Sequence, residues 1–330
     1  MPNIREIKHR ISAVKSTRKI TRAMQLVAAA KLRRAQENIL KLRPYALRFE
    51  QVMAQVAAWT SSDIHPLLAP PHRSGSPSSA RAHDGAPPHE HPMGTPAENG
   101  RNRRFLLILV TGDSGLSGGF NANLIRAARS YIAEHEGCER LDLYCVGRKG
   151  RDFFVKTKHT PVGQKVNFFN RLKFADAAQI VSDITRLFLG GGYDRVDILY
   201  NEFGSAIRQV LTVKQFLPFV PVKPAGPRLS EEHTTSTLTE SRPAAVYLYE
   251  PDERTVLGAL IPRNLEVQMW RVMLESYAAE MGAKMTAMDA ATENADEFLT
   301  ALSVSYNRAR QAQITKELTE IVGGAESLGG

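Results

Sequence analysis

The first 56 residues of this chain carry apolar side chains at alternating steps of three and four residues. Thirteen of the sixteen positions in this series, which runs from Ile4 to Val56, are apolar. The polar exceptions are three neighbours in the series, Arg18, Thr21 and Gln25. Such spacing places one apolar seam along a helix, as in a coiled coil. Because proline lacks an amide proton and clashes with the preceding turn, we expect one helix to about Arg43 and then, at Pro44, a kink or break before a shorter helix.

The C-terminal end of the chain repeats this pattern. Ten of eleven positions between residues 267 and 302 are apolar, and Lys284 is the exception. The predicted helix runs from Arg263 to Val322, with Pro262 just before it and Gly323-Gly324 ending it. At 1.5 Å per residue such a helix is roughly 90 Å long, far longer than most helices of globular proteins.

The two ends of the chain also carry opposite charge. Residues 1–50 hold 13 Lys and Arg against three Glu, whereas the chain from residue 262 onward holds six Lys and Arg against ten acids. Opposite charge suits two elements that lie side by side, or one basic element that faces an acidic partner. We therefore expect the two helices to pair.

An antiparallel pair with Pro44 level with Pro262 sets Ile4 opposite Leu302. This register leaves residues 303–322 without a partner in the chain, as an overhang of about 30 Å. The overhang carries three apolar side chains, Ile314, Leu318 and Ile321. Because such a helix is not expected to stand alone in water, we expect it to sit in a sleeve made by other subunits, with folding back onto the middle of the chain as the alternative.

The middle of the chain alternates predicted strands and helices. The expected strands are residues 105–110, 141–147, 195–203, 210–219 and 244–250, and the clear helices are 121–135 and 175–189. Strands that alternate with helices favour parallel βαβ units with right-handed crossovers. The predicted fold class is therefore α/β, with a Rossmann-like βαβ domain inserted between two long helices that form an antiparallel coiled coil.

Composition sets the expected domain boundaries. Residues 66–102 hold eight of the eighteen prolines, which predicts a disordered loop that joins no core. The expected division is an N-terminal helix over 1–60, a disordered Pro- and His-rich loop over 61–104, an α/β domain over 105–250 with a linker at 221–243, and a C-terminal helix with its tip over 251–330. The loop histidines, His72, His83, His89 and His91, are irregularly spaced without supporting acids or cysteines, so we predict no metal site.

Cysteine usage and hydropathy bear on the compartment. The two cysteines, Cys138 and Cys145, form neither a disulfide framework nor a zinc cluster, which favours reduced thiols. No run approaches the roughly 18 apolar residues of a membrane span, and the N-terminus lacks the apolar core of a signal peptide. We expect a cytoplasmic protein that docks on a membrane, if at all, through partners.

The stretch TGDSGLSGGFN, residues 111–121, follows a predicted strand and precedes a predicted helix. It lacks the lysine of a P-loop and the Gly-x-Gly-x-x-Gly spacing of a dinucleotide site, so we predict no nucleotide cofactor. GLSGG fits the nucleophile elbow of a hydrolase, with Ser117 as nucleophile and with Asp197 and His233 in the required order. The simpler interpretation is a tight structural turn, with Asn121 or Ser117 capping the helix.

Several stretches resemble one family, the gamma subunit of the F-type ATP synthase. They are IREIKHRISAVKSTRKITRAMQLVAAAKLRRAQ, TGDSGLSGGFN, YLYEPD, AKMTAMDAATENA and YNRARQAQITKELTEIVGGA. In this family a cysteine usually stands where Ser117 stands here. Thiol control of the chloroplast type is not expected, because residues 204–245 contain no cysteine.

The resemblance implies a non-catalytic rotating shaft without a cofactor. Its implied partners are three alpha and three beta subunits around one shaft, an epsilon subunit and the c-ring of a proton-driven rotor. It implies peripheral attachment to the cytoplasmic side of the bacterial inner membrane. Arg310, Gln311 and Thr315 match the family's contacts with the beta subunits near the tip, Met24 matches a shaft position beside a beta-subunit loop, and Lys284 is a further shaft contact. Lys284 stands where the family often has arginine, which would weaken a bidentate pair.

Two other classes of function remain as alternatives. A serine hydrolase would use Ser117. A basic coiled coil that binds nucleic acid would use the positive N-terminal helix, but residues 1–44 contain no aromatic side chain for base stacking.

Overall fold

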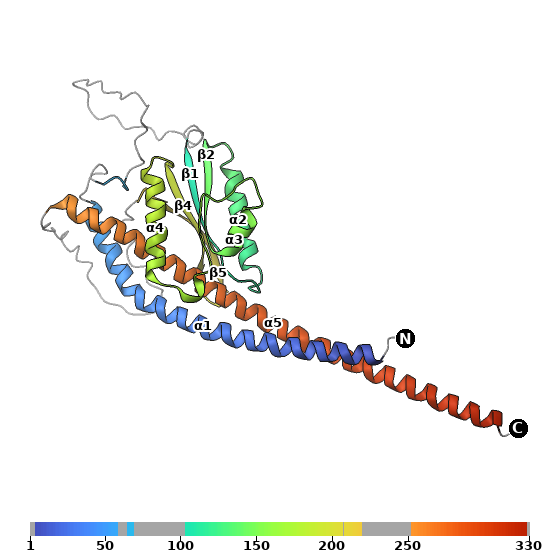
Figure 1. Cartoon of the computed structure of the whole chain (residues 1–330). Coiled ribbons are helices and arrows are strands. Elements are labelled where there is room, and N and C mark those ends of the chain that lie inside the picture. Colours follow the sequence, from blue (N-terminus) through green and yellow to red (C-terminus); the bar gives the residue numbers. More distant parts are fainter. Residues whose placement is uncertain (1–3, 59–64, 69–102, 207, 220–251, 329–330) are drawn as a thin grey trace, which may run out of the picture.

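Two long antiparallel helices and one α/β domain make up the computed structural model, which describes residues 4–58, 65–68, 103–206, 208–219 and 252–328. Helix α1 (Ile4–Ala58) pairs with helix α5 (Glu253–Leu328), and α5 continues past the N-terminus of α1 (Figure 1). The α/β domain lies toward the end of the pair that is away from the two termini. The predicted fold class is confirmed.

The sheet of the inserted domain has the strand order β3-β2-β1-β4-β5. Its strands are β1 (Arg104–Val110), β2 (Arg140–Val146), β3 (Gly163–Lys165), β4 (Arg195–Phe203) and β5 (Gln209–Leu217). Strands β1 to β4 pair in parallel, whereas β5 pairs with β4 antiparallel. The four predicted strands that lie within the described residues are confirmed; the one expected at 244–250 lies outside them.

Helices cover both faces of this sheet. They are α2 (Phe120–Glu134), α3 (Arg148–Phe154) and α4 (Phe174–Leu189), together with the short 3-10 helix η1 (Phe169–Arg171). Because side chains alternate along a strand, Leu106 and Ile108 of β1 pack toward α4 and α5, while Leu107 and Leu109 pack toward α2. The pattern predicted α2 and α4 but not α3, β3 or η1.

Pro44 and Pro262 both lie inside long helices, so the helix end expected at Arg43 and the helix start expected at Arg263 are wrong. Helix α1 continues through Pro44, so the expected break is wrong, but Figure 1 shows the helix changing direction in its second half, as a kink would make it do. Helix α5 starts ten residues before Arg263 and passes through both Pro262 and Gly323-Gly324. Proline removes one backbone hydrogen bond, but both helices continue, with Ala46 buried two residues after Pro44 and with Ile261, beside Pro262, fully buried.

The start of the segment expected to be a disordered loop belongs to the core instead. Residues 65–68 form a turn, Leu67 is buried in the main hydrophobic cluster, and the amide of Phe219 donates to its carbonyl oxygen at 2.8 Å. The expectation that residues 66–102 join no core is therefore wrong at Leu67. Residues 69–102, with their four histidines, lie outside the described residues.

The helix pair is confirmed, but its predicted register is wrong. Arg18 of α1 forms an ion pair with Asp296 of α5 at 2.6 Å. Counting fourteen residues from Arg18 back to Ile4, and fourteen from Asp296 forward to Arg310, sets Ile4 level with Arg310 and not with Leu302. The shift is about eight residues, close to one seven-residue repeat, and a repeating apolar seam looks much the same after such a shift.

Candidate functional site

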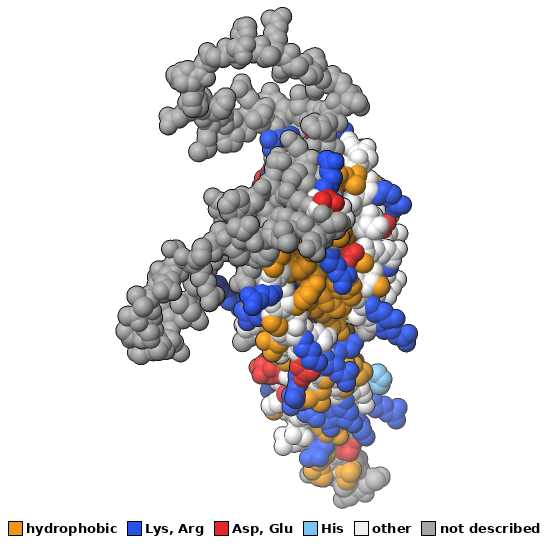
Figure 2. Space-filling model, turned by 90° about the vertical axis from the view of Figure 1, so that its left-hand side faces the viewer, with side chains coloured by type: hydrophobic (Ala, Val, Ile, Leu, Met, Phe, Trp, Pro, Cys, Tyr) orange, Lys and Arg blue, Asp and Glu red, His pale blue; other side chains and the backbone are white. Residues whose placement is uncertain are grey.

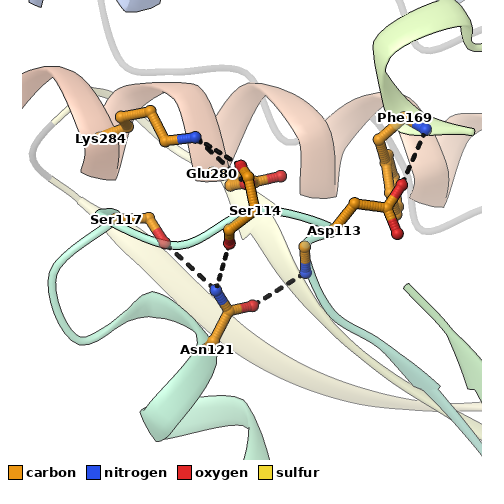
Figure 3. Close-up of polar contacts among 8 residues, drawn as sticks. Asp113, Ser114, Ser117, Asn121, Phe169, Glu280 and Lys284 are labelled. Atoms are coloured by element: carbon orange, nitrogen blue, oxygen red, sulfur yellow. Dashed lines mark hydrogen bonds and ion pairs between the residues drawn. The ribbon is translucent and has the colours of Figure 1, made fainter. Parts of the chain in front are cut away.

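The glycine-containing loop between β1 and α2 is tied to its own domain by the carboxylate of Asp113. This carboxylate accepts hydrogen bonds from the amides of Arg148 at 2.9 Å, Asn167 at 2.9 Å and Phe169 at 3.1 Å (Figure 3 shows the bond to Phe169). The three donors lie at the carboxyl end of the sheet, after β2 and β3. Asp113 is buried, and it joins the loop after β1 to the segments that follow β2 and β3.

Asn121, in the first turn of α2, closes the same loop. Its Oδ1 accepts from the amide of Gly112 at 2.9 Å, and its Nδ2 donates to the carbonyl oxygen of Ser114 and to Oγ of Ser117, both at 3.2 Å. The residue that precedes the helix is Gly119, which makes no side-chain cap. The expected capping of α2 by Asn121 or Ser117 is therefore wrong, because both side chains bind within the loop.

The loop then docks on α5 through Glu280, a carboxylate that is only 2% exposed. The hydroxyl of Ser114 donates to Oε1 of Glu280 at 2.7 Å, and Lys284 donates to the Ser114 hydroxyl at 2.5 Å (Figure 3). The Lys284 ammonium lies 3.6 Å from Glu280. Burial raises the pKa of Glu280, and the Ser114 hydrogen bond and the Lys284 charge oppose that rise.

This placement bears on the predicted role of Lys284. Its side chain is 12% exposed, and its ammonium is engaged by the loop and by Glu280 of its own helix. A contact with another subunit is not what this geometry favours. Lys284 is the polar exception in the C-terminal apolar series because it binds Ser114 of the inserted domain, 170 residues away in the sequence.

The hydrolase alternative gains no support from the geometry. Ser117 is 2% exposed, and its hydroxyl accepts a hydrogen bond from Asn121. Asp197 lies in β4, where it accepts from Tyr131 at 2.6 Å and pairs with Arg195 at 2.9 Å. His233 lies outside the described residues. Among the residues that the structure describes, no group of three or more His, Cys, Asp or Glu could hold a metal ion.

The remaining predicted site residues lie at two separate heights on the helix pair. Met24 is half-buried on α1, about twenty residues of helix, or roughly 30 Å, from Arg310. Arg310, Gln311 and Thr315 are exposed on the part of α5 that extends past α1. Thr315 donates its hydroxyl to the carbonyl oxygen of Gln311 at 2.9 Å, so these two residues share one helix face.

From Arg310 to Gly323 every residue of α5 is exposed. Four of these are large apolar side chains that no other described residue covers: Ile314, Leu318, Ile321 and Val322, between 47% and 68% exposed. On the face of the molecule that Figure 2 shows, Lys and Arg side chains outnumber acids. The exposed end of α5 thus carries large apolar side chains that no other described residue covers.

The chain is similar to known proteins along nearly its whole length. The family model described as ATP synthase matches residues 3–328. An ATP synthase gamma chain of Chloroherpeton thalassium is 40% identical over 99% of both chains, and one of Geobacter sp. is 39% identical over 100% of both. A solved chain of the Euglena gracilis mitochondrial ATP synthase (OSCP/F1/c-ring, rotational state 3) has a TM-score of 0.61 at 18% identity, covering 98% of this chain and 94% of that one. None of the helices in the described part of the chain contains a hydrophobic stretch that could span a bilayer.

Two antiparallel helices of unequal length, joined through an inserted α/β domain, define a stalk subunit, a class of protein that works inside a larger assembly. The unpartnered tip and the buried loop serine both agree with that class. The chain belongs to the ATP synthase gamma chain family. It is accordingly a non-catalytic subunit, and the loop that resembles a nucleophile elbow is a structural junction.

Proposed function

We propose that this chain is the central shaft of a proton-translocating ATP synthase and couples rotation of a membrane rotor to ATP synthesis or hydrolysis in the catalytic head. The observation that carries the proposal is the exposed tip of α5. A helix with four large apolar side chains in solvent needs a partner surface, because contiguous apolar patches of this kind mark interaction sites.

The proposed surroundings of the shaft follow from its family. Three alpha and three beta subunits surround the tip, and the inserted domain rests with an epsilon subunit on the c-ring. The complex then sits on the cytoplasmic side of the bacterial inner membrane, and the chain is held there through its partners. The exposed Lys and Arg side chains of α1 would face acidic surface in the head.

Contacts with the beta subunits are proposed at Met24 and at the tip residues Arg310, Gln311 and Thr315. The three tip residues are exposed and project from the unpaired part of α5. An asymmetric shaft of this kind drives each catalytic subunit through its states by contacting those states differently. Lys284 is left out of the proposed contacts because its ammonium is engaged inside the chain.

The proposal is tested by reconstituting the full chain with alpha and beta subunits and measuring ATP hydrolysis. We expect one copy of the chain to assemble with three copies of each partner, by mass and light scattering. A chain that ends at Ala309 should assemble less well or change the rate of hydrolysis. If the intact chain forms no complex, the proposal is wrong.

A matched pair of variants separates the apolar tip surface from helix length. Replacing Ile314, Leu318 and Ile321 by serine keeps the length of α5 and removes the apolar surface, so it should reproduce the effect of truncation. Leu189→Ser, at the end of α4, removes an apolar side chain of similar exposure (46%) from the inserted domain and should leave hydrolysis unchanged. Equal effects of the two variants would argue against a specific role of the tip.

A further inference from the structure

Three polar pairs interrupt the apolar seam between α1 and α5. Gln25 donates to Asp289 at 2.5 Å, the hydroxyls of Thr21 and Thr292 lie 2.8 Å apart, and Arg18 pairs with Asp296 at 2.6 Å. We call these six residues the polar seam cluster. The α1 members are the three polar exceptions in its apolar series, so every exception in that series has a polar partner on α5.

The cluster adds little stability compared with apolar residues at the same positions. Thr21 and Thr292 are at most 9% exposed; one hydroxyl donates to the other, and the second has a carbonyl oxygen of its own helix as acceptor, but an apolar pair of the same shape would lose no water on burial. Arg18 and Asp296 are 42% and 53% exposed, and exposed ion pairs contribute little to folding. Polar residues inside a coiled-coil seam characteristically specify register at a cost in stability.

The rest of the seam leaves a register choice open. Ala28 and Ala35 lie seven residues apart on α1, and Met281, Met288 and Ala295 follow at intervals of seven on α5, all of them buried. When a seam repeats every seven residues, a slide of one repeat again places small and apolar residues opposite one another. Such a slide would move the tip by roughly 10 Å.

Slides of one repeat would disrupt the polar seam cluster in either direction. One slide would set Gln25 against Gly282, which has no side chain to accept its amide, and would set Asp296 against Ile11. The opposite slide would set Asp289 against Leu32. A carboxylate or amide left without a partner in a partly buried seam carries a desolvation penalty.

We propose that the polar seam cluster fixes the register of α1 on α5 and so sets where the exposed tip begins. Arg18, Thr21, Gln25 and their three partners are positioning residues, and they hold Arg310, Gln311 and Thr315 at one height relative to the rest of the shaft. The register itself is independent of any partner protein. Its consequence for the height of the tip in a catalytic head rests on the proposed function.

The register is measured by disulfide formation in the full chain without partners. Ile11 and Leu302 each lie ten residues from the Thr21–Thr292 pair, so cysteines at these positions report the native register. Cysteines at Ile11 and Ala295 report a slide of one repeat. The background carries Cys138→Ser and Cys145→Ala, which remove the two native thiols. The cluster variant carries Thr21→Val, Gln25→Leu, Asp289→Leu and Thr292→Val.

With the cluster intact, the native pair should form its disulfide and the slid pair should not. In the cluster variant, the yield of the slid pair should rise about tenfold, which corresponds to about 1.4 kcal/mol of register preference. The melting temperature should stay the same or rise, whereas residues that only stabilise the pair would lower it on replacement. Unchanged yields in the cluster variant would overturn the proposal and assign the register to the apolar contacts.

Two further variants complete the test. Thr17→Val with Thr300→Val is the control, because both hydroxyls donate only to carbonyl oxygens of their own helix, and it should leave the native register intact. Gln25→Leu with Asp289→Leu alone removes an amide and a carboxylate that a slide would leave without partners, and it serves if the fourfold variant does not fold; it should still raise the yield of the slid pair. If the cluster variant takes the slid register in this assay but assembles normally in the reconstitution, the outcome for the register and the outcome for the proposed function are told apart.

Discussion

Glu280 of α5 fills the space that a side chain at Gly112 would need. A Cβ atom built on Gly112 would lie 2.6 Å from Cδ of Glu280 and 2.7 Å from its Oε1, closer than real Cβ contacts. A side chain at Gly112 would therefore have to displace the carboxylate of Glu280 from its contacts with Ser114 and Lys284. Lys284 and Ser114 complete this junction, so its parts come from two distant regions of the chain.

Gly112→Ala should lower the free energy of unfolding by about 1–3 kcal/mol, because the added methyl group overpacks a site already filled by a carboxylate. Chemical denaturation of the full chain measures this change. The penalty should shrink in a Glu280→Ala background, where the space is vacant. Gly258→Ala is the control: nothing lies within 4 Å of its added Cβ, and alanine favours a helix interior by roughly 0.5–1 kcal/mol. Equal penalties in both backgrounds would exclude the steric explanation.

Glu280→Gln should flatten the pH dependence of stability. Burial raises the pKa of Glu280, so the folded chain binds this proton more tightly than the unfolded chain does. The stabilisation from this group is present below the ordinary carboxyl pKa of about 4.3 and is lost as pH rises through the raised value. The variant should therefore gain stability relative to the parent chain as pH rises above the ordinary carboxyl pKa. Lys284→Met should have the opposite effect and steepen the dependence; a constant difference across pH would contradict the assignment.

Asp113→Ala should be among the most damaging changes in the inserted domain. It removes the acceptor of three backbone amides at the carboxyl end of the sheet, and each buried donor left unpaired costs roughly 1–3 kcal/mol. We expect a loss of at least about 2 kcal/mol in urea unfolding. Asp152→Ala removes a half-exposed carboxylate paired with Arg151, and it should change stability by less than about 0.5 kcal/mol.

Ser117→Ala tests the hydrolase alternative directly. The Ser117 hydroxyl accepts one hydrogen bond from Asn121, so its loss should cost about 1 kcal/mol or less. A serine-directed phosphonate should label neither the parent chain nor the variant. Labelling of the parent chain alone would restore Ser117 as a nucleophile.

Local periodicity made the helix pair and most of the sheet predictable. The apolar series on α1 contains the buried residues Ile7, Ala28, Leu32 and Ala35, and the short apolar runs coincide with β1, β2 and β4. Prolines were a weaker guide, since tertiary packing carries both long helices through Pro44 and Pro262.

What the sequence pattern did not determine depends on contacts between distant residues. The register follows from side chains 264 to 278 residues apart, and the apolar repeat alone favours no single choice. The role of Lys284 was equally hidden, because Ser114 belongs to another domain. The signal that could have revealed the register was present in the sequence: three polar exceptions on α1, with acids and a threonine available at matching spacing on α5.

The pairing of α1 with α5 has a consequence for how the protein is made. Arg18 and its partner Asp296 are 278 residues apart, and at about 5–20 residues per second the ribosome needs roughly 14–56 seconds to synthesise the intervening chain. During that time the apolar seam of α1 has no α5 to cover it. Helix α1 is synthesised first but can pair with α5 only at the end of synthesis. Chaperones that bind exposed apolar segments would therefore be expected to bind α1 in the meantime.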